Sequence, residues 1–135
     1  MFRWCTDYRA KDGAITGEGY SRRVLSRSPT QVVYEDLWWE KDGWRWRHYR
    51  VRLTPPDRWH AESTANYRDM TIDYRLVDLP DRRTRLDLRI RRRPTALYPH
   101  QPTKSEMTAD LTRSWGRYAR QLERDYRASR RRPRP

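Results

Sequence analysis

Three side chains in the segment VVYEDLWW carry groups suited to acid–base chemistry or to ligand binding. Tyr34, Asp36 and Trp38 alternate along this segment, and alternate residues of a strand point to the same face. If this face is buried, burial raises the pKa of the Asp36 carboxyl group, unless an arginine binds the carboxylate. A carboxyl group with a raised pKa beside Tyr34 would form an acid–base pair. An Asp–arginine pair is the more frequent outcome. Both faces of the segment are partly apolar, so the sequence leaves its facing open.

Other side chains could line a ligand pocket. His60, in the polar run DRWHAEST, is either a surface histidine or a donor and general acid toward a carbonyl. Tyr49 and Tyr74 share faces with apolar residues and belong to a core or a cavity wall. Trp115 and Tyr118 are the best candidates for contact with a ligand, because each combines a large ring with a polar group.

No motif indicates a metal site, a cofactor or an activated nucleophile. The three histidines and the single cysteine, Cys5, lack the spacing of metal ligands. The five glycines are too scattered for a phosphate-binding loop. Cys5 has no obvious base near it, so we expect an inert thiol. We therefore expect no cofactor, and the sequence leaves open whether the protein is an enzyme.

These side chains would be positioned by six strand-like runs, which cover residues 14–27, 30–40, 44–54, 57–66, 69–79 and 82–93. Short turns rich in glycine, proline and aspartate, including Lys41–Gly43, connect consecutive runs. Alternating runs with such connections are typical of an antiparallel meander.

One long helix is expected after the strands. Thr103 and Glu106 form a capping box, and apolar residues recur at helical steps as far as Tyr126, which predicts a helix to about residue 128. Gly116 inside this helix suggests close approach of a neighbouring backbone. The predicted fold class is α+β, with a six-stranded antiparallel meander curled around one C-terminal helix.

This order of elements resembles the START-related, Bet v 1-like helix-grip superfamily (SRPBCC), which includes polyketide cyclases and dehydrases and lipid-transport proteins. The resemblance spans about residues 14–128. It rests on the segments GEGYSRRVL (17–25), VVYED (32–36), VRLTPPDRWHAES (51–63) and TRSWGRYARQLERDY (112–126). It implies a cavity between sheet and helix that binds a hydrophobic or aromatic small molecule, such as a lipid, a polyketide or a quinone. Family members include cyclases and carriers, so the resemblance does not decide on catalysis.

The chain departs from that family at its N-terminal end. The family has a strand and two short helices before the first strand seen here, whereas residues 1–13 can supply only the end of the second helix and its exit loop. We expect a truncated helix-grip domain over 14–128 and a disordered basic tail over 129–135. Strand 82–93 then has an open edge, which favours a homodimer or a marginally stable monomer.

The charge balance predicts attraction to polyanions. The 135 residues include 31 basic and 18 acidic side chains, for a net charge of +13, and we expect nonspecific polyanion binding through the arginine-rich surface. No stretch is long and apolar enough for a membrane span, and no signal peptide is evident. With a single cysteine, these features favour a cytoplasmic protein.

Aromatic and arginine residues interleave in residues 32–53, which allows two interpretations. In the first, the segment is a nucleic-acid platform whose tryptophans stack on bases and whose arginines bind phosphates. Its residues would be Trp38, Trp39, Trp44, Trp46, Arg45, Arg47, Arg50 and Arg52. In the second, the segment is a cavity wall with arginines on its solvated outer face. Strand alternation places the two sets mostly on opposite faces, which favours the second interpretation. The alternative is a basic module that binds nucleic acid or anionic surfaces.

Overall fold

In a computed structural model, the chain is described over residues 1–41, 43–95 and 102–131. Asp42, in the expected turn, and residues 132–135, in the expected tail, lie outside this part, as do residues 96–101. The described elements are α1 (Phe2–Cys5), α2 (Asp12–Thr16), β1 (Ser21–Arg27), β2 (Gln31–Glu40), β3 (Gly43–Thr54), β4 (Arg58–Ala65), β5 (Arg68–Leu79), the 3-10 turn η1 (Pro80–Arg82), β6 (Arg83–Pro94) and α3 (Lys104–Arg131).

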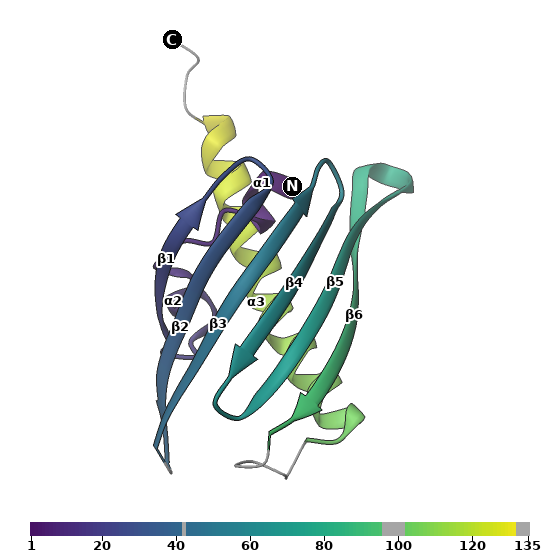
Figure 1. The fold of residues 1–135 in the computed structure, drawn as a ribbon. Helices are drawn as coiled ribbons and strands as arrows, with labels where there is room; N and C mark the ends of the chain where they lie inside the picture. The colour runs from purple at the N-terminus through teal and green to yellow at the C-terminus, as the bar shows by residue number, and fades with distance from the viewer. Residues whose placement is uncertain (42, 96–101, 132–135) are drawn as a thin grey trace.

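The six strands form one antiparallel sheet in chain order, β1 to β6. Figure 1 shows a twisted sheet with α3 crossing one face and the short helices α1 and α2 lying on that same side. The predicted α+β class, the six-stranded meander and the long C-terminal helix are therefore confirmed. Strands β1 and β6 form the two edges of the sheet.

The N-terminal segment is more ordered than the sequence indicated. Residues 1–13 contain α1 and the start of α2, and the first strand begins at Ser21 rather than at residue 14. Gly13 allows α2 to lie against the chain that enters β1. A Cβ atom at Gly13 would lie 2.2 Å from the carbonyl oxygen of Tyr20, so a side chain here would force the two segments apart. The prediction that residues 14–20 are extended is therefore wrong.

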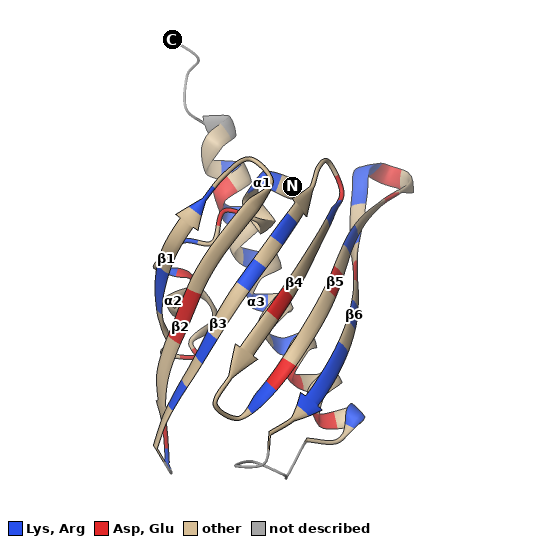
Figure 2. Cartoon of the chain, in the orientation of Figure 1, with Lys and Arg blue, Asp and Glu red and all other residues tan. Residues whose placement is uncertain are grey.

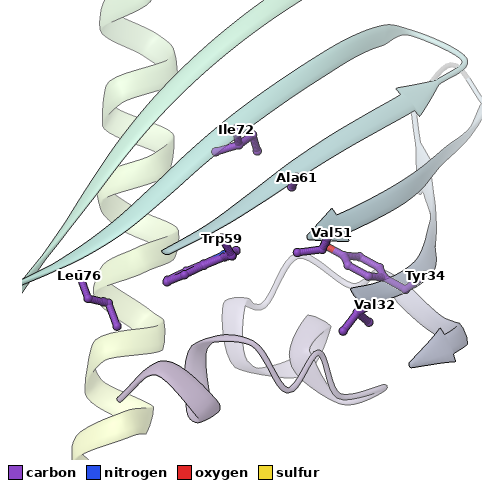
Figure 3. Packing of buried hydrophobic residues seen from close by; sticks show 7 residues of the cluster. All are labelled: Val32, Tyr34, Val51, Trp59, Ala61, Ile72 and Leu76. Carbon is purple, nitrogen blue, oxygen red and sulfur yellow. The ribbon is translucent and has the colours of Figure 1, made fainter. Parts of the chain in front are cut away.

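The core lies on the face of the sheet that carries the helices. Its buried members alternate along β2 to β5 and are Val32, Tyr34, Val51, Trp59, Ala61, Ile72 and Leu76 (Figure 3). This pattern settles the facing of β2, because Tyr34 and Asp36 are buried whereas Leu37 is exposed. On the edge strand β6, the apolar side chains Leu86 and Ile90 pack partly buried against this core.

Helix α3 begins at the predicted capping box. The backbone nitrogen of Glu106 donates to Oγ1 of Thr103 at 3.2 Å, and the Glu106 carboxylate accepts from the Thr103 backbone nitrogen at 2.7 Å. The helix continues to Arg131, beyond the predicted end at residue 128, so the first residues of the expected disordered tail are helical. No helix in the described ranges has the length and apolarity to span a membrane.

In the first half of β3, arginine lies on the inner face and tryptophan on the outer face, which is the reverse of the expected arrangement. Arg45 and Arg47 point inward and are only 3% and 7% exposed, whereas Trp44 and Trp46 point outward and are 56% and 44% exposed. Basic residues recur along β3 and β6 in Figure 2. Strand alternation explains this arrangement. Arg45 and Arg47 are an even number of residues from the buried Val51, so their side chains point to the same face as Val51. The prediction that arginine lies on the outer face of the wall is therefore wrong for these two residues.

Candidate functional site

A cavity of about 610 Å³ lies between the sheet, the N-terminal segment and α3. This volume is within the range of roughly 300–1,000 Å³ that is typical of small-molecule sites. Twelve of its 29 lining residues are aromatic, and the rings come from every layer of the fold. They belong to Trp4, Tyr8, Tyr20, Tyr34, Trp38, Trp39, Tyr49, Trp59, Tyr67, Tyr74, Trp115 and Tyr118.

The residues singled out from the sequence mostly come together around this cavity. Those that line it are Tyr34, Asp36, Trp38, Tyr49, Tyr74, Trp115 and Tyr118. His60 is the exception, and its placement is a correction. Its neighbours Trp59 and Ala61 are buried, so strand alternation turns His60 to the other face. There its Nδ1 lies 2.6 Å from Oδ1 of Asp73.

Stacked rings form two parts of the aromatic wall. The Tyr34 ring lies between those of Tyr8, at 4.8 Å, and Tyr49, at 4.5 Å, measured between ring centroids. On β4 and β5, the rings of Trp59 and Tyr74 stack at 4.8 Å with an interplanar angle of 9°. Such surfaces suit a flat apolar ligand, because offset stacking adds to the free energy gained from burial.

Trp115, on α3, contacts the second of these stacks. Its ring lies 6.0 Å from that of Tyr74, in an edge-on arrangement, and 5.3 Å from that of Tyr118. The cavity wall is therefore continuous from the sheet to the helix at this point. A side chain at this junction is well placed to contact a molecule held between the two layers.

A buried ion-pair cluster occupies one part of the wall. The guanidinium of Arg22 donates to both oxygens of Asp36, at 2.7 and 2.8 Å, and to Oδ2 of Asp12 at 2.6 Å. Burial raises the pKa of both carboxyl groups, while the Arg22 charge opposes that rise. The Asp–arginine alternative recognised in the sequence is therefore the observed one. This bidentate contact fixes Asp36 for structure and leaves it poorly placed for proton transfer.

Two tyrosine hydroxyl groups meet beside this cluster. The Tyr20 and Tyr118 oxygens are 2.8 Å apart, which joins β1's entry segment to α3. Burial raises the pKa of Tyr20 to about 12 and that of Tyr118 still further. Both are therefore neutral at physiological pH. Because one of the two hydroxyl groups donates to the other, one hydroxyl proton of the pair is left to donate to a ligand.

A second group of charged side chains was missed from the sequence. The guanidinium carbons of Arg47 and Arg68 lie 4.7 and 5.0 Å from the ring centroid of Tyr67, and all three residues line the cavity. Arg47 also donates to the Tyr49 hydroxyl at 3.2 Å. Strand alternation could have predicted the position of Arg68. It is an even number of residues from the buried Ile72 on β5, so the two side chains point to the same face.

The N-terminal segment closes part of the cavity. Phe2 packs edge-on against Trp59 at 5.7 Å, and Nε1 of Trp4 donates to Asp125 on α3 at 2.8 Å. Cys5 packs against the core, and burial raises its pKa to about 11, in line with the inert thiol expected from the sequence. Residues 1–8 thus supply part of the cavity wall, where the sequence indicated only the end of a helix and its exit loop.

Comparisons of the chain with protein-family models, with curated proteins and with solved structures found no match. Of the resemblance to helix-grip proteins expected from the sequence, the structure supports the order of elements, a six-stranded meander followed by a long helix.

Proposed function

We propose that this protein binds a hydrophobic or aromatic small molecule in the cavity between its sheet and α3, as a helix-grip protein would. The observation that carries the proposal is the cavity of about 610 Å³ with its wall of stacked rings. Each Å² of apolar ligand surface removed from water contributes roughly 25 cal/mol to binding. A lipid-like, polyketide-like or quinone-like body supplies such surface.

The proposal is for binding rather than for cyclase or dehydratase chemistry. Asp36, the carboxylate that the sequence offered as an acid or base, is held by Arg22 through two hydrogen bonds. His60, the other candidate acid, faces away from the cavity and contacts Asp73. Binding needs neither group to move a proton, so it is the simpler function for this set of residues.

The test is titration with phenylnaphthylamine, an uncharged dye that fluoresces in apolar surroundings. We expect saturable binding at about one dye per chain. Trp115→Ala should weaken it, because the ring lies at the junction of sheet and helix. Trp46→Ala removes an exposed ring of the outer face and should leave dye binding unchanged. Loss of a packed tryptophan also destabilises a protein by roughly 3–5 kcal/mol, so each variant is first checked for cooperative unfolding. A wild-type chain that binds no dye would contradict the proposal.

One observation favours a second candidate, the basic nucleic-acid-binding module. Trp44, Trp46 and Arg50 are all exposed on the outer face of β3, so an aromatic and a basic group do share one solvent-facing surface. Stacking on these rings and phosphate contacts would give salt-dependent binding of single strands. Binding of an oligonucleotide at physiological salt, lost in Trp46→Ala but kept in Trp115→Ala, would support this candidate.

A further inference from the structure

Two guanidinium groups at the cavity have hydrogen-bonding capacity that no described residue uses. Arg47 is 7% exposed, and its one described hydrogen bond is the contact with the Tyr49 hydroxyl. The Nε atoms of Arg47 and Arg68 are buried and have no acceptor among the described residues. A buried donor without an acceptor is unfavourable, and more so when it carries charge.

The carboxylates that line the same cavity do not accept from these two Nε atoms, and each described one has another partner. Asp12 and Asp36 bind Arg22, and Glu40 forms an ion pair with Arg45 and accepts from Nε1 of Trp38. Toward the exposed rim, Asp7 contacts Arg9, Glu18 contacts Ser114, and Asp110 contacts Arg113. The buried hydrogen-bonding groups without a partner in the described part of the cavity are therefore donors, on Arg47 and Arg68.

The two cations share one aromatic neighbour. Both are close to the ring of Tyr67. Burial lowers the pKa of Arg68, and the charges of Arg47 and Arg92 add to this effect. An anion placed between Arg47 and Arg68 would relieve their repulsion and accept their free N–H groups, and arginine is suited to bind a planar or tetrahedral oxyanion.

We propose that the ligand is an amphipathic anion, whose single carboxylate, sulfonate or phosphate group binds Arg47 and Arg68 while its apolar body lies along the aromatic wall. This inference rests on the proposed function and adds the chemical class and the orientation of the ligand. The head group lies at the Tyr67 end of the cavity. The body extends toward the rings of Trp59, Tyr74 and Trp115, which line the same cavity.

The test uses two dyes with the same ring system. Anilinonaphthalene sulfonate carries one negative charge, and phenylnaphthylamine is its uncharged parent. Hydrogen bonds to charged groups contribute enough free energy for a preference of roughly tenfold or more. We therefore expect the sulfonate to bind the wild-type chain about tenfold more tightly than the uncharged dye, with mutual competition.

The control must separate the buried arginines from the overall positive charge. Arg47→Gln and Arg68→Gln each remove a charge from the cavity, and Arg50→Gln removes the same charge from the exposed outer face of β3. We expect the first two variants to bind the sulfonate about tenfold more weakly and the uncharged dye within about twofold of wild type. Arg50→Gln should change neither. Arg68 is the less buried of the two, so its variant keeps the test valid where Arg47→Gln does not fold.

The outcomes distinguish the two proposals. If neither dye binds, the proposed function fails. If both bind equally and the glutamine variants change neither, the cavity is a ligand site but the anion inference is overturned. Loss of sulfonate binding to the same extent in Arg50→Gln also overturns it, since general charge would then explain the preference. Displacement of the sulfonate by decanoate or by decyl phosphate, with decanol as the uncharged control, identifies the head group that the pair of arginines prefers.

Discussion

Asp36 and Arg47 are direct partners across β2 and β3, yet among the described side chains they form no ion pair with each other. Asp36 gives both carboxylate oxygens to Arg22 on β1. Arg47 turns toward the hydroxyl of Tyr49 and the ring of Tyr67 instead. On the inner face of the sheet, carboxylates therefore engage Arg22 but not Arg47, and the charge of Arg47 is available to a ligand.

The first prediction concerns the engaged arginine. Asp36→Asn removes a carboxylate from a pair whose side chains are 6% and 8% exposed, and leaves Arg22 with Asp12 alone. We expect a loss of about 3 kcal/mol in the free energy of unfolding, at the lower end of the range for a broken buried pair. The control is Glu35→Gln on the same strand, where the pair with Arg23 is exposed and little change is expected. Equal stability of the two variants in urea would contradict a structural role for Asp36.

The second prediction compares two glycines. Gly13→Ala places a Cβ atom 2.2 Å from the Tyr20 carbonyl oxygen, so α2 must shift, at a cost of roughly 1–3 kcal/mol. At Gly116, inside α3, a Cβ atom would meet the flexible end of Arg120 at 3.7 Å, an ordinary contact. Gly116→Ala should therefore raise stability by up to about 1 kcal/mol through helix propensity. Thermal unfolding of both variants checks the signs, and destabilisation by Gly116→Ala would restore the close backbone approach suggested by the sequence.

The fold was largely predictable because its signals are local. The capping box at Thr103 fixes the start of α3, and alternation on β5 and β6 places Ile72 and Ile90 on the same face. The N-terminal helices were not predictable, since α1 and α2 are too short to show a helical period. What orders them is contact with distant residues, such as Phe2 with Trp59.

The site was only partly predictable, for a related reason. The aromatic lining follows from composition and strand alternation. Which face of β3 points inward could be predicted only by following the alternation along the whole strand. Tyr49 and Val51 share their face with Arg47, and hydrophobicity alone argues against placing an arginine inside. Its burial is tolerated because the rings of Tyr49 and Tyr67 cover the guanidinium.

The third prediction is alkaline unfolding driven by buried tyrosines. Burial raises the pKa of six of them, which are Tyr8, Tyr20, Tyr34, Tyr67, Tyr74 and Tyr118. A group whose pKa is raised in the folded state favours folding below its unfolded pKa, which is about 10 for tyrosine. That contribution is lost as the pH rises toward the folded value, which is about 12 for Tyr20. Stability should therefore fall steeply above about pH 10, and tyrosinate absorbance should appear together with the loss of circular dichroism. Ionisation of these tyrosines in a chain that stays folded would contradict their burial.

The fourth prediction tests the N-terminal wall. Trp4→Phe keeps an aromatic ring near Tyr118 but removes the donor to Asp125. We expect a modest loss of stability, of about 1 kcal/mol. Binding of phenylnaphthylamine should remain, since the ring still lines the cavity. Trp4→Ala should weaken both stability and dye binding. If Trp4→Ala binds the dye as wild type does, the N-terminal segment is not part of the binding wall.

The central claim is that the ligand binds between the sheet and α3, and the indole N–H signals of the tryptophans test it most directly. In a nuclear magnetic resonance titration with phenylnaphthylamine, the signals of Trp59 and Trp115, which line the cavity, should shift and saturate together. Trp44 and Trp46 lie on the outer face, and their signals should stay in place. Shifts confined to Trp44 and Trp46, with Trp59 and Trp115 unchanged, would place binding on the outer face and contradict the account.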